Sequence, residues 1–149
     1  MAGAVMTALP RTLRAGEVTV GATLPEQRIV ATPTRIISTA IATRDFQDVH
    51  HDRDLAVAKG SADIFFNILT DTGFVQRYVT DWAGPEALVR SVKIKLGVPC
   101  YAYDTLVLTG TVTAKRDSGR VAVAVRGAGK LGDHVTGTVE IDLPGKDVA

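Results

Sequence analysis

Residues 68–85 read ILTDTGFVQRYVTDWAGP and form the longest helical pattern in the 149-residue chain. Side chains suited to one buried face recur three and four positions apart, at Ile68, Thr72, Val75, Val79 and Trp82, with Leu69 and Tyr78 widening that face. Gly84 and Pro85 follow, and such residues end helices. Because much of this helix surface is apolar, we expect a sheet to wrap around it.

The chain after residue 87 alternates between apolar and polar residues, which is the period of β-strands. Strands are predicted at residues 88–96, 106–114, 121–125 and 135–143. In the first of them, Leu88 and Leu96 are expected on the apolar face, and Lys93 on the opposite one. The strands and the long helix predict an α+β arrangement. It is an antiparallel meander forming a curved sheet around one long central helix, which is a single hot-dog fold.

Two shorter helical segments precede the long helix. Thr32 and Pro33 provide an N-cap and a first helical residue, and the pattern that they start runs to about Arg44. Residues 54–58 predict one or two further helical turns. Upstream of both, residues 27–30 are predicted to form a short edge strand.

Length and composition indicate one ordinary domain. The first sixteen residues lack acidic side chains but also lack the continuous apolar stretch of a targeting peptide. We therefore expect a flexible N-terminal tail at residues 1–20 and one hot-dog domain at residues 21–145.

Charge and cysteine content narrow the possible partners and location. The formal net charge is +1, which gives no reason to expect nucleic acid or a membrane surface as a partner. No apolar run approaches the length of a membrane span. Cys100 is the only cysteine, so no internal disulfide can form and a cytoplasmic location is expected.

The candidate site lies at residues 42–56, which read ATRDFQDVHHDRDLA. Asp45 and His50 stand five positions apart in a segment between two predicted helices. A loop held in this way can direct a carboxylate and an imidazole at one water molecule, the minimum for general acid/base chemistry. His51 is expected to face elsewhere. A metal site is not expected, because adjacent residues rarely bind one ion and no further His or Cys cluster supports it.

This segment resembles the MaoC-like, R-specific enoyl-CoA hydratases. Their signature is Asp-x-Asn-Pro-apolar-His, then five residues, then Ala or Ser. Here Asp45, His50 and Ala56 keep both spacings. Gln47 and Asp48 replace the Asn-Pro pair, and Gln47 can still form hydrogen bonds that support the loop.

Longer runs resemble one branch of that family, the small subunits of actinobacterial steroid enoyl-CoA hydratases. The resemblance covers residues 21–143 and is carried by residues 42–53, 67–73, 78–85, 96–99 and 131–135. It implies a role in degrading a sterol side chain, with the catalytic pair on this chain. It also implies a heterotetramer with a larger MaoC-like subunit that lacks the pair, completes the cavity and can dock an aldolase.

The resemblance further implies roles for individual residues. Asp45 and His50 would hold the water that adds to a steroid acyl-CoA. Relatives place a His-Gly pair before the long helix, and the glycine N–H forms part of an oxyanion hole. Phe66 and Asn67 stand there, so Asn67 would donate its backbone N–H and Phe66 would shape the pocket. No metal or other cofactor is implied, because coenzyme A is part of the substrate.

Other functions remain open from the sequence. The chain could be a general R-specific hydratase of short or medium-chain enoyl-CoA. A hot-dog thioesterase could use Asp71 on the long helix to activate a hydrolytic water. A non-catalytic assembly subunit is a third reading, against which the Asp45–His50 spacing argues. In each case the exposed sheet edge is expected to associate with another chain.

Overall fold

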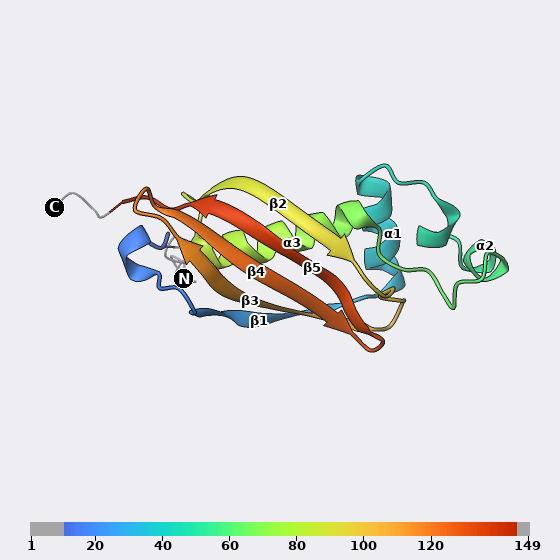
Figure 1. Cartoon of the computed structure of the whole chain (residues 1–149). Coiled ribbons are helices and arrows are strands. Elements are labelled where there is room, and N and C mark those ends of the chain that lie inside the picture. Colours follow the sequence, from blue (N-terminus) through green and yellow to red (C-terminus); the bar gives the residue numbers. More distant parts are fainter. Residues whose placement is uncertain (1–10, 146–149) are drawn as a thin grey trace, which may run out of the picture.

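A computed structural model describes residues 11–145 of the chain. Its main elements are β1 Thr23–Val30, α1 Pro33–Ala42, α2 Arg53–Ala58, α3 Ile68–Ala83, β2 Leu88–Leu96, β3 Thr105–Lys115, β4 Arg120–Gly129 and β5 Gly132–Asp142. The strands form one five-stranded antiparallel sheet that curves along α3, while α1 and α2 lie beyond one end of it (Figure 1). The predicted hot-dog architecture is confirmed.

The strand order, β1-β3-β4-β5-β2, differs from a simple meander. Only β3, β4 and β5 pair with their neighbours in sequence, and β2 pairs with β5 at the far edge. β1 forms the other edge beside β3, as expected for residues 27–30. The alternation of apolar residues reports which face of a strand is buried but not which strands are neighbours, so it could not give this order.

The core lies between α3 and the concave face of the sheet. Val75 and Val79 of α3 are fully buried, as are Leu108, Val123 and Val139 of the three central strands. Burying each such side chain contributes roughly 1.5–3 kcal/mol.

The predicted buried face of the long helix is wrong at its first turn. Ile68 and Leu69 are about half exposed, whereas Thr70 and Asp71 point inward and are buried. This turn lies beside α1 at the end of the sheet (Figure 1).

A β-bulge in β2 changes which side chains at the start of the strand face the core. The pairing with β5 shifts between Val89 and Ser91, and such an extra residue reverses the alternation on either side of it. Val89 and Val92 therefore both pack against the core, while Leu88 is 56% exposed. Lys93 lies on the exposed face as expected.

Residues 11–20 pack against the domain. The N–H of Leu13 donates a 2.8 Å hydrogen bond to the Ala83 carbonyl, and Val18 is only 3% exposed. The packed part of the chain therefore begins before the expected boundary at residue 21. Residues 1–10 of the expected tail lie outside the described residues.

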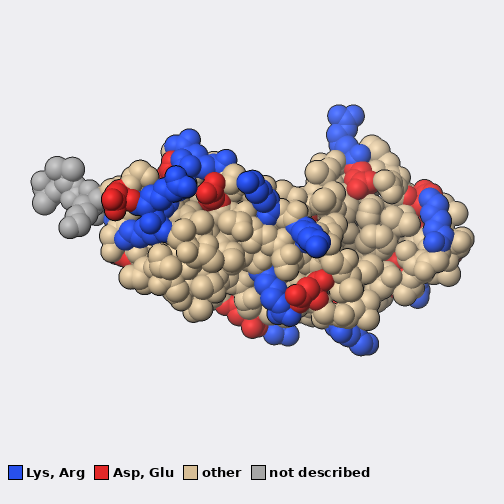
Figure 2. Space-filling model, in the orientation of Figure 1, with Lys and Arg blue, Asp and Glu red and all other residues tan. Residues whose placement is uncertain are grey.

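Charges of both signs are interspersed on the face shown in Figure 2, with broad uncharged areas between them. None of the helices in residues 11–145 combines the length and apolar character that crossing a bilayer requires.

Candidate active site

Asp45 is placed by the end of α1. The helix starts as expected, with the Thr32 side chain accepting the Arg35 N–H and Pro33 as the first residue. It ends at Ala42, slightly before the predicted end. Arg44 then adopts a left-handed φ of 58°, and the N–H of Asp45 donates a 3.0 Å bond to the Ala40 carbonyl. This reversal directs the chain from the helix into the loop that carries the site.

His50 is held by a backbone carbonyl. It ends a short 3-10 turn, Asp48–His50, and its side chain is 9% exposed. Nδ1 of His50 lies 2.8 Å from the Phe65 carbonyl oxygen, and the two rings pack edge to face with centroids 4.9 Å apart. Because a carbonyl only accepts, Nδ1 carries the hydrogen and Nε2 is the atom available for chemistry.

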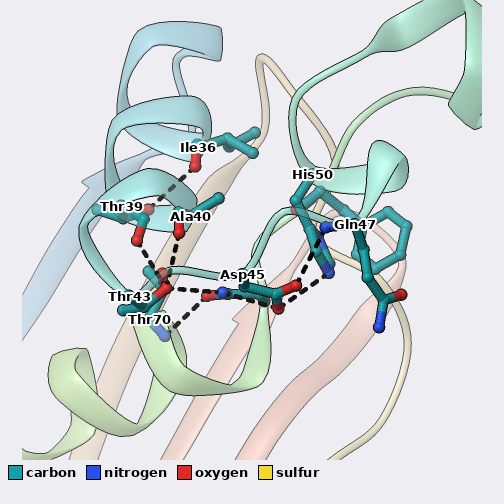
Figure 3. Close-up of polar contacts among 10 residues, drawn as sticks. Ile36, Thr39, Ala40, Thr43, Asp45, Gln47, His50 and Thr70 are labelled. Carbon is teal, nitrogen blue, oxygen red and sulfur yellow. Dashed lines mark hydrogen bonds and ion pairs between the residues drawn. The ribbon is translucent and has the colours of Figure 1, made fainter.

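Asp45 and His50 converge, as Figure 3 shows, although they come from opposite ends of the loop. Oδ2 of Asp45 lies 3.6 Å from Nε2 of His50. That separation is longer than a direct hydrogen bond, and one water can contact both atoms. The Asp45 side chain is 19% exposed, so the pair is shielded but reachable.

Asn67 connects α3 to this pair. It is the N-cap of α3, and its Oδ1 accepts the Thr70 N–H at 2.9 Å. Its Nδ2 donates to Thr43 Oγ1 at 2.9 Å and to Asp45 Oδ2 at 3.0 Å. Within residues 11–145 the backbone N–H of Asn67 has no acceptor. An unpaired N–H at a helix N-terminus is suited to bind a developing oxyanion.

Gln47 supports the loop through its backbone. Its N–H donates to Asp45 Oδ1 at 3.3 Å, while its side chain is exposed and points away from the pair (Figure 3). Asp45 thus accepts hydrogen bonds on both oxygens, which fixes the orientation of its carboxylate.

Phe66 lies in the core instead of at a pocket. It is 1% exposed and packs edge to face on Phe74, with ring centroids 5.2 Å apart. In this extended segment successive side chains point to opposite sides, so it is the preceding Phe65 that faces His50.

Two supporting groups had no clear sequence signal. The Phe65 group that holds His50 is a backbone carbonyl, which every residue type has. The Thr43 hydroxyl donates to the Thr39 carbonyl at 2.8 Å and accepts from Asn67. Only its position two residues before Asp45 could have drawn attention to it.

Asp71, the residue considered for a thioesterase, is fully buried. Its Oδ2 lies 2.9 Å from Nε2 of His134, and burial raises the pKa of its carboxyl group. A carboxylate with no exposed surface cannot activate a water at the thioester, so this structure gives the thioesterase reading no support. Within residues 11–145, His, Cys, Asp and Glu side chains form no group of three suited to a metal ion.

The chain is similar to known proteins in sequence and in fold. No protein-family model matches the chain. It is 65% identical over 124 residues to the 3-oxo-4,17-pregnadiene-20-carboxyl-CoA hydratase beta subunit of Mycobacterium tuberculosis, covering 83% of this chain and 95% of that protein.

Solved structures give the same result. A chain of the ChsH1-ChsH2 complex from Mycobacterium tuberculosis superposes with a TM-score of 0.82 and 65% identity, covering 84% of this chain and 98% of that one. The R-hydratase PhaJ1 of Pseudomonas aeruginosa gives a TM-score of 0.80 at 21% identity, covering 91% and 88%. The latter likeness shows the fold alone.

The curved sheet and the central helix are those of a MaoC-like hydratase. Within this class, the chain belongs to the family of the 3-oxo-4,17-pregnadiene-20-carboxyl-CoA hydratase beta subunit. The predicted resemblance to the steroid branch is thereby confirmed.

Proposed function

We propose that this chain is the catalytic subunit of a hydratase of sterol catabolism. It adds water across the α,β double bond of a steroid side-chain enoyl-CoA thioester. The observation that carries this proposal is the 3.6 Å gap between Asp45 Oδ2 and His50 Nε2. Asn67, whose backbone N–H has no acceptor among the described residues, contacts Asp45 through its side chain. The 65% identity to a steroid carboxyl-CoA hydratase subunit supports the substrate class.

The reaction begins with polarisation of the thioester. Its carbonyl oxygen accepts the Asn67 N–H at the N-terminus of α3, where the helix dipole stabilises developing negative charge. A water held between the pair attacks the β-carbon as Asp45 takes one of its protons. That proton passes from Asp45 to Nε2 of His50, which gives it to the α-carbon. One water is consumed, and the enzyme ends in its starting protonation state.

A second subunit is part of the proposal. Phe46, Ile68 and Leu69 are 65%, 49% and 52% exposed beside the site, and water-exposed apolar surface of this kind marks a covering partner. The strand β2 also ends the sheet with an open edge. The similar chain was solved in a two-protein complex. We propose a cytoplasmic heterotetramer with a larger MaoC-like subunit, through which an aldolase docks.

The test is an assay of the purified chain, alone and with the larger subunit, on a steroid enoyl-CoA and a short-chain enoyl-CoA. Loss of the conjugated thioester and release of free thiol are followed together. Cys100 does not disturb the thiol measurement, because it is fully buried and its pKa is raised to about 12 by burial and, less strongly, by Asp104 and Asp71.

Hydration of the steroid ester that requires the partner supports the proposal. It should fall by roughly 10²–10⁴ in Asp45→Asn. Hydration of the short ester by the chain alone would replace the proposal with a general R-specific hydratase. Release of thiol without hydration would replace it with a thioesterase.

A further inference from the structure

A second carboxylate–imidazole pair, Asp71 and His134, lies in the core behind the site. Asp71 is in the first turn of α3 and His134 is on β5. Their side chains are 0% and 3% exposed. Well-packed apolar residues are often as stabilising as a buried ion pair or more so, so stability alone is a weak reason for this pair.

His134 connects three parts of the fold. Its Nε2 meets Asp71 of α3, and its Nδ1 donates to the Val98 carbonyl at 2.7 Å. The His134 carbonyl in turn accepts the Gly97 N–H at 2.8 Å, and the Val98 N–H donates to the Asp133 carbonyl at 3.0 Å. The imidazole is thus fixed between β5 and the loop that follows β2. Through its contact with Asp71, it fixes the first turn of α3 to these two segments.

Asp71 links His134 to the candidate site through hydrogen bonds. Its N–H donates to the Asn67 carbonyl at 3.1 Å across one helical turn. Asn67 then donates from Nδ2 to Asp45 Oδ2 at 3.0 Å. A continuous series of hydrogen bonds therefore runs from Val98 to the carboxylate of Asp45.

Asp71 depends on one side-chain partner. Its Oδ1 and the neighbouring Thr70 Oγ1 are buried without a hydrogen-bond partner among the described residues. Leaving buried polar atoms unpaired is costly. Because only His134 satisfies the carboxyl group, its loss would free the first turn of α3 to shift.

We propose that Asp71 and His134 are positioning residues for hydration. They hold the first turn of α3 so that the Asn67 N–H meets the thioester oxygen and the Asn67 side chain meets Asp45. The proposal rests on the function proposed above, because the positioned groups are those that act on the enoyl thioester.

The experiment compares kcat, KM and melting temperature for the complex with its partner subunit. Asp71→Ala and His134→Gln are expected to lower kcat about 10²-fold, the usual cost of a misplaced oxyanion donor, with little change in KM. Asp71→Asn is expected to keep most of kcat. Its amide can donate to Nε2 of neutral His134 while Nδ1 stays bonded to Val98.

Val139→Ala is the matched control for stability. Val139 is fully buried on β5, as His134 is, but no hydrogen bond links its side chain to the site. This variant should melt at a lower temperature and keep the wild-type kcat below that temperature.

Three results would overturn the positioning role: unchanged kcat in His134→Gln, an equal loss of kcat in Val139→Ala, or an equal loss in Asp71→Asn and Asp71→Ala. If Asp71→Ala does not fold, Asp71→Asn is compared with His134→Gln instead, and an equal loss of kcat in these two variants would overturn the positioning role. A wild-type complex that hydrates no enoyl-CoA would instead overturn the proposed function.

Discussion

Nδ1 of His50 donates a 2.8 Å hydrogen bond to the carbonyl oxygen of Phe65, and this leaves Nε2 facing Asp45. The carbonyl accepts from Nδ1 whether the imidazole is neutral or charged. The imidazole therefore always exchanges its proton through the same atom. This single contact fixes both the orientation of the ring and the nitrogen that faces Asp45.

His50→Gln is expected to lower kcat by roughly 10²–10⁴, because the variant loses the proton-exchanging nitrogen. His51→Gln is the matched control, since His51 is adjacent but exposed, and its kcat should equal that of wild type. Steady-state hydration by the complex measures both. Equal losses in the two variants would remove the assignment to His50.

Two variants of Asn67 distinguish its capping of α3 from its proposed contribution to catalysis. Asn67→Ala removes the N-cap and should lower the free energy of unfolding by about 1 kcal/mol. Asn67→Ser keeps a capping oxygen for the Thr70 N–H but cannot reach Asp45 as the amide does. Both variants should lose kcat about tenfold or more, since a hydrogen bond to a charged group is lost, but only Ala should lose much stability. Urea unfolding and hydration rates test this, and a fully active Asn67→Ser would contradict it.

Gly137 permits close approach of β2 and β5. A Cβ at Gly137 would lie 2.3 Å from the Lys93 carbonyl oxygen, so Gly137→Ala forces the strands apart. It should lower the free energy of unfolding by about 1–3 kcal/mol. Gly73→Ala is the control, because a Cβ on this glycine of α3 meets nothing within 4 Å. It should raise the free energy of unfolding by about 0.5–1 kcal/mol, since glycine is unfavourable inside helices. A destabilised Gly73→Ala or a neutral Gly137→Ala in urea unfolding would contradict the geometry.

Asp142 makes the free energy of unfolding depend on pH in the acidic range. Hydrogen bonds from Arg120 and then Arg90 lower the pKa of Asp142 from 3.8 to about 2. A carboxyl group whose pKa is lower in the folded state stabilises the fold above its unfolded pKa. This contribution is complete above about pH 4 and is lost as the pH falls through the folded pKa, about 2.

The melting temperature of Asp142→Asn should therefore lie below that of wild type at pH 7. The two curves of melting temperature against pH should converge as the pH falls toward 2. A constant difference between them across this range would show that the ion pairs with Arg90 and Arg120 do not account for the effect.

Local patterns predicted the local structure well. The Thr32–Pro33 start of α1, the long helix α3 and the edge strand β1 were all visible, because capping and periodicity depend on near neighbours. The exposure of Leu88 in β2 was not, since the bulge between Val89 and Ser91 follows from pairing with β5. The Asp45–His50 pair was predicted from its spacing, and the two side chains converge. The burial of Phe66 against Phe74 was not predicted.

The sequence by itself determined the element types, the hot-dog architecture and the Asp45–His50 pair of the candidate site. Tertiary structure alone decided how that site is held. His50 bonds to a carbonyl 15 residues away, Asp45 to an amide 22 residues away, and Asp71 to an imidazole 63 residues away. Such contacts depend on how the sheet and α3 bring distant segments together. Neither residue type nor periodicity records them, because backbone carbonyls and buried polar side chains acquire their partners only when the chain is folded.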